Sequence, residues 1–155
     1  MGMRILVAED SPSFALLYKS SLEPRGHKVD LTEDGMACIY KYVDESKKSE
    51  KIGEQKFSYD LVILDHQMPR MKGLDVAKEI LEFNPKQRIL IVTAHVKTML
   101  EGIRKLSSKI EVVSKPFPSL AMIRQVEGLA RFRWQQKLAK GMKEWDGETG
   151  LSEPI

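Results

Sequence analysis

Four short runs of aliphatic and β-branched residues recur along the chain, and most of them lack the polar positions that a half-exposed strand would show. Near-continuous apolarity is typical of strands covered on both faces, as in a parallel sheet. A fifth and weaker run, His27 to Leu31, alternates polar and apolar residues and is predicted to lie nearer the edge of the sheet. The four strong runs are Arg4 to Ala8, Leu61 to Leu64, Arg88 to Thr93 and Ile110 to Val113.

Segments with the start and stop signals of helices separate these runs. Ser11-Pro12 offers a cap and a suitable first residue for one helix, and Asn84-Pro85 stops another. The predicted order is a strand followed by a helix, five times over. Right-handed crossovers then build an α/β fold, a doubly wound sheet with helices on both faces. The expected helices cover Ser13 to Leu22, Met36 to Val43, Leu74 to Phe83, Val96 to Leu106 and a segment from Ser119 onward.

The length and composition of the chain suit one compact domain. Its 155 residues, 42% of them hydrophobic, can form a sizeable core but leave no room for a second full-sized domain. No apolar run approaches the roughly 18 residues of a membrane span, and the first residues lack the pattern of a secretory signal, so we expect a cytoplasmic protein. The single cysteine, Cys38, cannot form an internal disulfide, and a net charge of +3 does not by itself indicate nucleic acid as a partner.

Polar side chains stand at the carboxyl ends of four predicted strands, which is where doubly wound sheets bind ligands. They are Glu9 and Asp10 after the first strand, Asp65 after the third, Thr93 on the fourth and Lys115 after the fifth. Three carboxylates at one edge repel one another unless a cation lies among them, and hard oxygen ligands favour Mg²⁺. Such an ion leaves coordination positions open for a phosphoryl oxygen, which Lys115 and Thr93 would also contact. Asp65 is the expected nucleophile, because a carboxylate can attack phosphorus to give an aspartyl phosphate.

The same residues belong to short motifs that resemble those of response-regulator receiver domains. Each motif stands at a strand end, and the resemblance covers about residues 3 to 132. It implies a flavodoxin-like, five-stranded parallel sheet with the strand order 2-1-3-4-5. The motifs are Glu9-Asp10, Asp65 followed by Met68-Pro69 and Gly73, Thr93-Ala94, and Lys115-Pro116-Phe117.

This resemblance also implies a function and a role for each motif residue. A receiver of this kind accepts a phosphoryl group on Asp65 from a histidine kinase or a histidine phosphotransfer protein, and the transfer depends on Mg²⁺. The chain would then be a phosphoacceptor of two-component signalling that switches protein-protein interactions, with no enzymatic activity beyond its own phosphorylation and dephosphorylation. Thr93 and Lys115 would read the phosphorylated state. The metal ligands would be Glu9, Asp10, Asp65 and the backbone carbonyl of Gln67.

Two enzyme families share part of this chemistry. Phosphohydrolases of the haloacid dehalogenase type carry a second acid two residues after the nucleophile, where this chain has Gln67. A flavodoxin would cradle a cofactor phosphate after the first strand, where Glu9 and Asp10 would repel it. Neither family agrees well with the sequence, and no cofactor other than Mg²⁺ is expected.

Three positions depart from the receiver pattern. Val112 stands where receivers commonly place an aromatic residue that is linked to the threonine as a switch. His95 stands where the family often places a side chain that affects hydrolysis of the phosphoryl group, although an exposed loop histidine without such a role is an equal alternative. Residues 44 to 56 are polar and longer than the usual connection, so they either extend the preceding helix or form a loop. We expect an exposed insertion there, with no catalytic role.

The last predicted helix is unusually long. Apolar residues recur every three or four positions from Ile123 to Trp145, and basic residues line its outer face. We assign residues 1 to 132 to the receiver domain and residues 133 to 155 to an extension without an output domain. The extension either docks a partner or a second copy, or folds back over the domain. A second hypothesis for the whole chain follows, in which this extension mediates assembly independently of phosphorylation. We do not expect nucleic acid or a membrane to be a partner.

Overall fold

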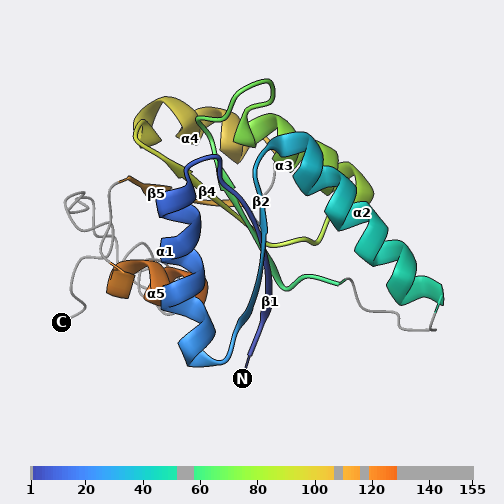
Figure 1. The fold of residues 1–155 in the computed structure, drawn as a ribbon. Coiled ribbons are helices and arrows are strands. Elements are labelled where there is room, and N and C mark those ends of the chain that lie inside the picture. Colours follow the sequence, from blue (N-terminus) through green and yellow to red (C-terminus); the bar gives the residue numbers. More distant parts are fainter. Residues whose placement is uncertain (1, 52–57, 107–109, 116–118, 129–155) are drawn as a thin grey trace, which may run out of the picture.

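Five parallel strands form a single sheet at the centre of the molecule. The computed structural model describes residues 2–51, 58–106, 110–115 and 119–128, and all statements about structure concern these residues (Figure 1). The strand order is β2-β1-β3-β4-β5, so the predicted flavodoxin-like architecture is confirmed. The strands are β1 Arg4–Ala8, β2 Lys28–Thr32, β3 Leu61–Asp65, β4 Ile89–Thr93 and β5 Ile110–Ser114.

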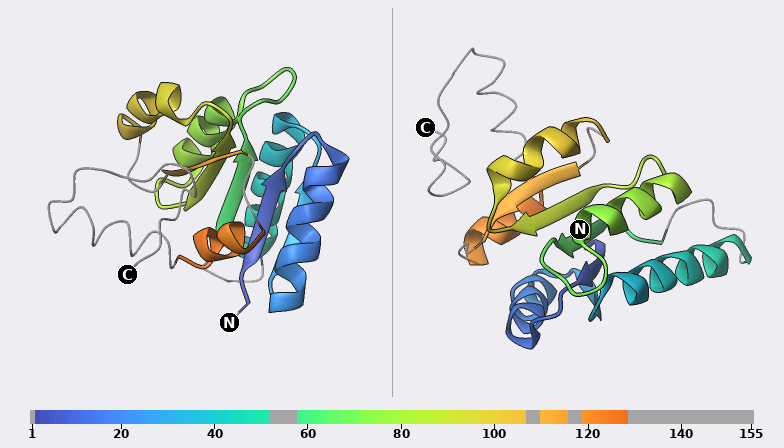
Figure 2. Two further views of the ribbon diagram at one scale, coloured as in Figure 1. Left: turned by 90° about the vertical axis from the view of Figure 1, so that its left-hand side faces the viewer. Right: turned by 90° about the horizontal axis from the view of Figure 1, so that it is seen from above.

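Helices cover both faces of this sheet. Helices α1 and α5 pack on one face, and α2, α3 and α4 pack on the other (Figures 1 and 2). The carboxyl ends of the strands all point to the edge from which α1 and α3 begin. The helices are α1 Pro12–Leu22, α2 Gly35–Lys51, α3 Gly73–Phe83, α4 Val96–Arg104 and α5 Ser119–Val126, with a short 3-10 helix, η1 Glu23–Arg25, after α1.

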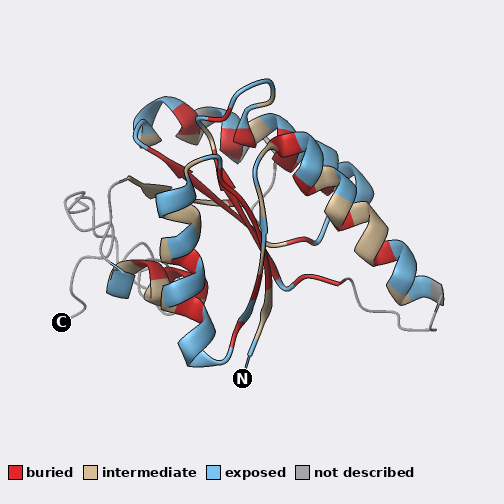
Figure 3. Ribbon diagram, viewed as in Figure 1, coloured by how far each residue is buried: buried red, intermediate tan, exposed pale blue. Residues whose placement is uncertain are grey.

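The three central strands are covered on both faces, as their composition predicts. All residues of β3 and β4 and all but the first residue of β1 are buried (Figure 3). Along β1, Ile5 and Val7 face the core beneath α1 and α5, whereas Leu6 and Ala8 face the core beneath α2, α3 and α4. Strand β2 lies at one edge, as its alternating sequence predicts, and begins one residue later than expected.

Helix α2 is longer than predicted. It continues through the polar stretch to Lys51, so this part of the stretch extends the helix, which was one of the two alternatives. Ser46 within it is buried, against the expectation of an exposed insertion, whereas Lys47, Lys48 and Glu50 are exposed. The buried face runs through Cys38, Tyr42 and Ser46, at a spacing of four residues. Ser46 can lie there because its hydroxyl donates to the Tyr42 carbonyl at 2.8 Å. Residues 52 to 57 lie outside the described residues.

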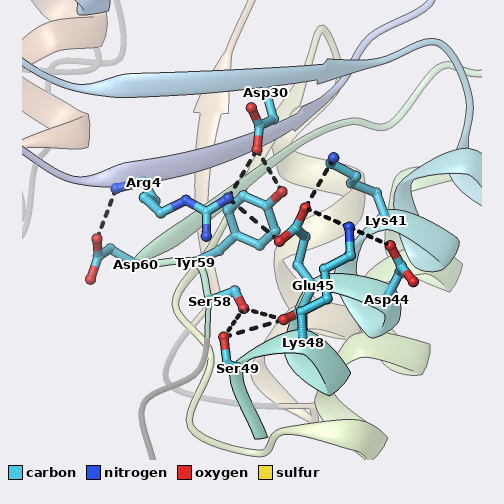
Figure 4. A network of polar contacts seen from close by, with 10 residues as sticks. All are labelled: Arg4, Asp30, Lys41, Asp44, Glu45, Lys48, Ser49, Ser58, Tyr59 and Asp60. Atoms are coloured by element: carbon cyan, nitrogen blue, oxygen red, sulfur yellow. Dashed lines mark hydrogen bonds and ion pairs between the residues drawn. The ribbon is translucent and has the colours of Figure 1, made fainter. Parts of the chain in front are cut away.

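A polar network fixes the second half of α2 to the sheet (Figure 4). Glu45 lies 3.8 Å from the Arg4 guanidinium, which also contacts Asp30 at 3.4 Å and lies over the Tyr59 ring at 4.8 Å. The Tyr59 hydroxyl donates to Asp30 at 2.7 Å. Ser58 donates to the Glu45 carbonyl at 2.7 Å, so the chain is fastened again where it re-enters the described structure.

Helix α5 ends earlier than the sequence pattern indicates. It ends at Val126, and a turn follows in which Gly128 has a φ of 88° and donates its N–H to the Gln125 carbonyl. Glycine adopts this left-handed conformation readily and commonly ends helices. The predicted continuous helix is therefore interrupted at Gly128, and its continuation from residue 129 to Trp145 lies outside the described residues.

Among the helices of the described residues, none combines the length and the apolar character that crossing a bilayer requires.

Candidate functional site

The parallel register brings two acidic residues side by side at the carboxyl edge of the sheet. Ala8 of β1 pairs with Leu64 of β3, so the residues that follow them, Glu9 and Asp65, are neighbours. Asp10 follows directly at the start of the turn into α1. One carboxylate oxygen from each of these three residues lies within 4.8 Å of the other two. Glu9 and Asp65 are only 2% and 3% exposed, whereas Asp10 is exposed, so this acidic cluster opens to solvent on the Asp10 side.

Lys115 supplies the positive charge of the cluster. Its ammonium lies 3.0 Å from Glu9 Oε1 and 3.4 Å from Asp65 Oδ1, and its backbone N–H donates to the Thr93 carbonyl at 2.8 Å. Lys115 follows β5, which lies two strands from β3, so the ammonium crosses the end of β4 to reach the carboxylates. One ammonium offsets part of the repulsion between the two buried acids.

Glu9 holds its proton more tightly than an ordinary glutamate. Burial and the neighbouring Asp65 carboxylate raise the pKa of Glu9 from 4.5 to about 7, although Lys115 and the Ser11 N–H oppose this rise. The Ser11 N–H donates to Glu9 Oε2 at 3.2 Å. A retained proton near neutral pH shows that the single Lys115 ammonium does not balance the negative charge of these carboxylates. A bound divalent cation would balance it.

The loop after β3 holds Asp65 in place. The Gln67 N–H donates to Asp65 Oδ1 at 3.1 Å, and the Gly73 N–H donates to the His66 carbonyl at 3.3 Å as α3 begins. A Cβ atom on Gly73 would lie 2.6 Å from the Asp65 carbonyl oxygen and 3.0 Å from His66 Cα. Glycine is required here because the start of α3 packs directly on the backbone of the acidic residue.

Thr93 is the last residue of β4, which lies between β3, the strand that ends in Asp65, and β5, the strand that Lys115 follows. Its side chain is fully buried, and its Oγ1 accepts the His95 N–H at 3.0 Å, immediately before α4. His95 itself is exposed. His66 directly follows Asp65 in the sequence. Burial lowers the pKa of His66, and the positive charge of Lys72 lowers it further. His66 Nδ1 has no hydrogen-bond partner among the described residues.

The structure brings together four of the predicted site residues: Glu9, Asp10, Asp65 and Lys115. Gln67 contacts Asp65 through its N–H, and Thr93 stands on the neighbouring strand with its hydroxyl engaged by the start of α4. Pro116 and Phe117, which complete the lysine motif, lie outside the described residues. Sequence reasoning missed Phe14, whose ring centroid lies 4.1 Å from the Lys115 ammonium. The only signal for it in the sequence was an aromatic residue within the first turn of the helix that follows the acidic pair.

Residues 5–127 match the family model described as the response regulator receiver domain. The chain belongs to the response regulator receiver family. As a receiver domain it is a phosphoacceptor and not an enzyme in the ordinary sense, and the acidic cluster is typical of the Mg²⁺ site of such domains. Both conclusions agree with what the motifs predict.

Curated relatives of this receiver domain include proteins of different lengths. The transcriptional regulatory protein CutR of Streptomyces coelicolor is 31% identical over 131 residues, which cover 83% of this chain and 54% of CutR. The response regulator receiver protein CpdR of Brucella abortus is 27% identical over 124 residues, which cover 80% of this chain and 93% of CpdR. The chain thus spans about half the length of CutR but nearly all of CpdR.

A solved structure shares the fold. The chemotaxis protein CheY4 of Vibrio cholerae aligns with a TM-score of 0.63 at 21% identity, covering 82% of this chain and 98% of that one. At this level of identity the likeness concerns the fold, and the chemistry rests on the residues described above.

Proposed function

We propose that this receiver domain is a single-domain response regulator, which accepts a phosphoryl group on Asp65 and thereby changes its binding to other proteins. The observation that carries the proposal is the meeting of Asp65 with Glu9, Asp10 and the Lys115 ammonium at the ligand-binding edge of the sheet. The match along most of CpdR, a response regulator receiver protein, supports a regulator of one domain.

In the proposed reaction, a carboxylate oxygen of Asp65 attacks the phosphorus atom of the donor. An acyl phosphate bond forms while the bond from phosphorus to the leaving group breaks, and the leaving group departs with that electron pair. The Lys115 ammonium, 3.4 Å from Asp65 Oδ1, is placed to donate a hydrogen bond to a phosphoryl oxygen and to balance its charge. Burial of Asp65 limits the access of competing water.

Glu9, Asp10 and Asp65 are the proposed ligands of Mg²⁺, together with the backbone carbonyl of Gln67. Their oxygens are close enough to share one ion, and the proton retained by Glu9 would leave when the ion binds. When bound, Mg²⁺ neutralises the phosphoryl oxygens and the carboxylates during transfer.

Phosphorylation is proposed to act through Thr93 and α4. The Thr93 Oγ1 atom accepts the His95 N–H in this structure, so a rotation of the Thr93 side chain towards a phosphoryl oxygen would disturb that contact. The backbone at the start of α4 would then be free to move. Val112 replaces the aromatic residue expected in this switch, so the proposed change depends on Thr93 and α4 alone. His95, exposed beside Thr93, is proposed to affect the lifetime of the phosphoryl group.

Receiver domains take their phosphoryl group from histidine kinases or phosphotransfer proteins, and we propose such a protein as the physiological donor here. The assembly role of the C-terminal extension rests on residues outside the described structure and stays a prediction from the sequence.

Incubation with acetyl phosphate and Mg²⁺, followed by intact-protein mass spectrometry, tests the proposed function. We expect the wild type to gain the mass of one phosphoryl group, and we expect Asp65→Asn and an EDTA-treated sample to gain none. An adduct of equal yield on Asp65→Asn would show that the group is carried elsewhere, and the absence of an adduct on the wild type would refute the proposal.

A further inference from the structure

An aromatic ring that belongs to none of the motifs lies against the ammonium of Lys115. The Lys115 Nζ atom is 4.1 Å from the centroid of the Phe14 ring. This distance is well within the roughly 6 Å over which a cation is attracted to the face of an aromatic ring. Lys115 therefore has an aromatic neighbour from α1 in addition to the carboxylates of Glu9 and Asp65.

The turn that fixes Glu9 also fixes Phe14. The Ser11 N–H donates to Glu9 Oε2, while the Ser11 hydroxyl caps α1 by accepting the Phe14 N–H at 3.5 Å. Pro12 at the start of α1 sets the backbone between them. A carboxylate and an aromatic ring are thus held on either side of one cap, and both contact the same ammonium.

A second aromatic residue, Tyr18, packs against the Phe14 ring. Tyr18 lies one helical turn further along α1, with ring centroids 6.3 Å apart and ring planes inclined at 46°. Tyr18 is 1% exposed, and its hydroxyl has no hydrogen-bond partner among the residues that the structure describes. Burial raises the pKa of Tyr18, so the hydroxyl stays neutral. Packing against the buried Tyr18 ring restricts where the Phe14 ring can lie.

The Phe14 ring and the two carboxylates interact with the Lys115 ammonium in different ways. Glu9 accepts an N–H hydrogen of the ammonium and Asp65 forms an ion pair with it, so both carboxylates compete with a phosphoryl oxygen for the ammonium. The ring face attracts the positive charge but is only a weak hydrogen-bond acceptor. It can therefore keep the ammonium at the site while the N–H groups change partners.

We propose that Phe14 is a positioning residue, which holds the Lys115 ammonium at Asp65 so that it meets the phosphoryl group as it arrives. This inference rests on the proposed function of Asp65 and extends it to a residue on α1. Phe14 acts through Lys115, and in this role it contacts neither the proposed Mg²⁺ ion nor the phosphoryl donor.

The rate of phosphorylation by acetyl phosphate at saturating Mg²⁺ tests the proposal. We expect Phe14→Leu, which keeps an apolar side chain but lacks the ring, to slow the reaction by between about three-fold and about ten-fold. Phe14→Tyr keeps the ring and should stay within about two-fold of the wild type. Leu16→Ala, on the exposed side of the same helix, is the matched control and should leave the rate unchanged. The Mg²⁺ affinity, measured by calorimetry, should be the same in all four proteins.

The same substitution in a Lys115→Met background separates positioning from a general structural effect. If Phe14 acts through Lys115, Phe14→Leu causes no further slowing when the ammonium is absent. An equal slowing in both backgrounds, or a Phe14→Tyr protein as slow as Phe14→Leu, would overturn the proposal. Urea denaturation of each variant checks that the fold is retained, and Phe14→Met is the substitute if Phe14→Leu does not fold.

A measurement that needs no phosphorylation distinguishes failure of this inference from failure of the proposed function. The ε-methylene group of Lys115 is bonded to the Nζ atom that lies 4.1 Å from the Phe14 ring centroid, so its NMR signals should be shifted upfield in the wild type and in Phe14→Tyr but not in Phe14→Leu. Signals at ordinary positions in the wild type would refute the contact itself. An unphosphorylated wild type with shifted signals would refute the proposed function and leave the contact between the ring and the ammonium in place.

Discussion

At the scale of single residues, Glu9 has a protonation state that depends strongly on its surroundings. Its carboxyl group is buried next to Asp65, and this raises the pKa of Glu9 to about 7 despite the contact with Lys115. Between its ordinary value of 4.5 and about 7, the folded protein therefore binds a proton that the unfolded chain releases. As the pH rises through this range, Glu9 loses its proton less readily in the folded protein than in the unfolded chain, and the free energy of unfolding decreases.

We predict that the free energy of unfolding of the metal-free protein decreases as the pH rises from about 4.5 to about 7 because of this group. Urea denaturation in the presence of EDTA at several pH values measures the decrease. Glu9→Gln, which has no proton to lose, should show a flatter dependence, and Mg²⁺ should restore stability to the wild type most strongly at the upper end of the range. An identical pH dependence in Glu9→Gln would contradict the assignment.

Gly73 shows how a motif residue can have a physical role that its position in the sequence does not reveal. In the sequence it is a motif residue directly before the predicted helix Leu74 to Phe83, and in the structure a side chain at Gly73 would collide with the Asp65 carbonyl oxygen. Only the folded chain places the first turn of α3 against the end of β3. The glycine is therefore tied to the position of the acidic residue as well as to the helix.

At the scale of elements, the apolar pattern of the sequence predicted only the first half of α2. Its first turns carry an apolar face that predicts a helix, but Ser46 and Glu45 continue that face with polar side chains. They can do so because the Tyr42 carbonyl accepts the Ser46 hydroxyl and because Arg4 and Lys41 lie beside the Glu45 carboxylate. Two of these partners are local, but Arg4 comes from β1, and its approach follows only from the tertiary fold.

We predict that Tyr59→Phe destabilises the protein by about 1.5 kcal/mol, because a partly buried hydrogen bond to the charged Asp30 carboxylate is lost. The ring and its contacts with Arg4 and Tyr42 are retained. Urea denaturation at neutral pH measures the change. The rate of phosphorylation by acetyl phosphate should stay the same, since the network joins α2 to Arg4 of β1, to Asp30 of β2 and to the residues just before β3, and includes no residue of the acidic cluster. A slowed reaction would show that the network communicates with the site.

At the scale of the whole molecule, the end of α5 is fastened to the region between α1 and β2. Glu127 contacts Arg25 at 2.7 Å and His27 at 3.0 Å. His27 Nδ1 accepts the Met3 N–H, so Nε2 is the nitrogen that carries the hydrogen directed at Glu127. Residues a hundred or more positions apart in the sequence thus hold the end of α5 in place, directly before the described residues end at residue 128.

We predict that the contact of Glu127 with Arg25 and His27 is lost in acid. The hydrogen bond from Arg25 is the main cause that lowers the pKa of Glu127 from 4.5 to about 2. A lowered pKa contributes stability above the unfolded value of 4.5, and this contribution disappears as the pH falls towards about 2. Glu127→Gln should therefore be less stable than the wild type at neutral pH, with a difference that shrinks over this range in urea denaturation. A constant difference would mean that the ionised carboxylate is not what stabilises the contact.

The sequence alone determined the sheet, its covered central strands and the residues of the acidic cluster. Central parallel strands are buried on both faces, so their composition is almost wholly apolar, and the polar residues that follow them stand out in the sequence. Parallel strands present their carboxyl ends at one edge of a sheet, and this rule is enough to predict that Glu9, Asp10, Asp65 and Lys115 lie together.

The tertiary structure alone decided which other side chains surround those residues. Phe14 of α1 contacts the ammonium of Lys115, which follows β5. The Arg4 partner of Glu45 and the Arg25 and His27 partners of Glu127 also come from segments far away in the sequence. Helix α5 ends at Val126 because Gly128 adopts a left-handed conformation, although the apolar spacing continues past it in the sequence. Such contacts depend on distances between elements that are far apart along the chain, and periodicity within one element carries no information about them.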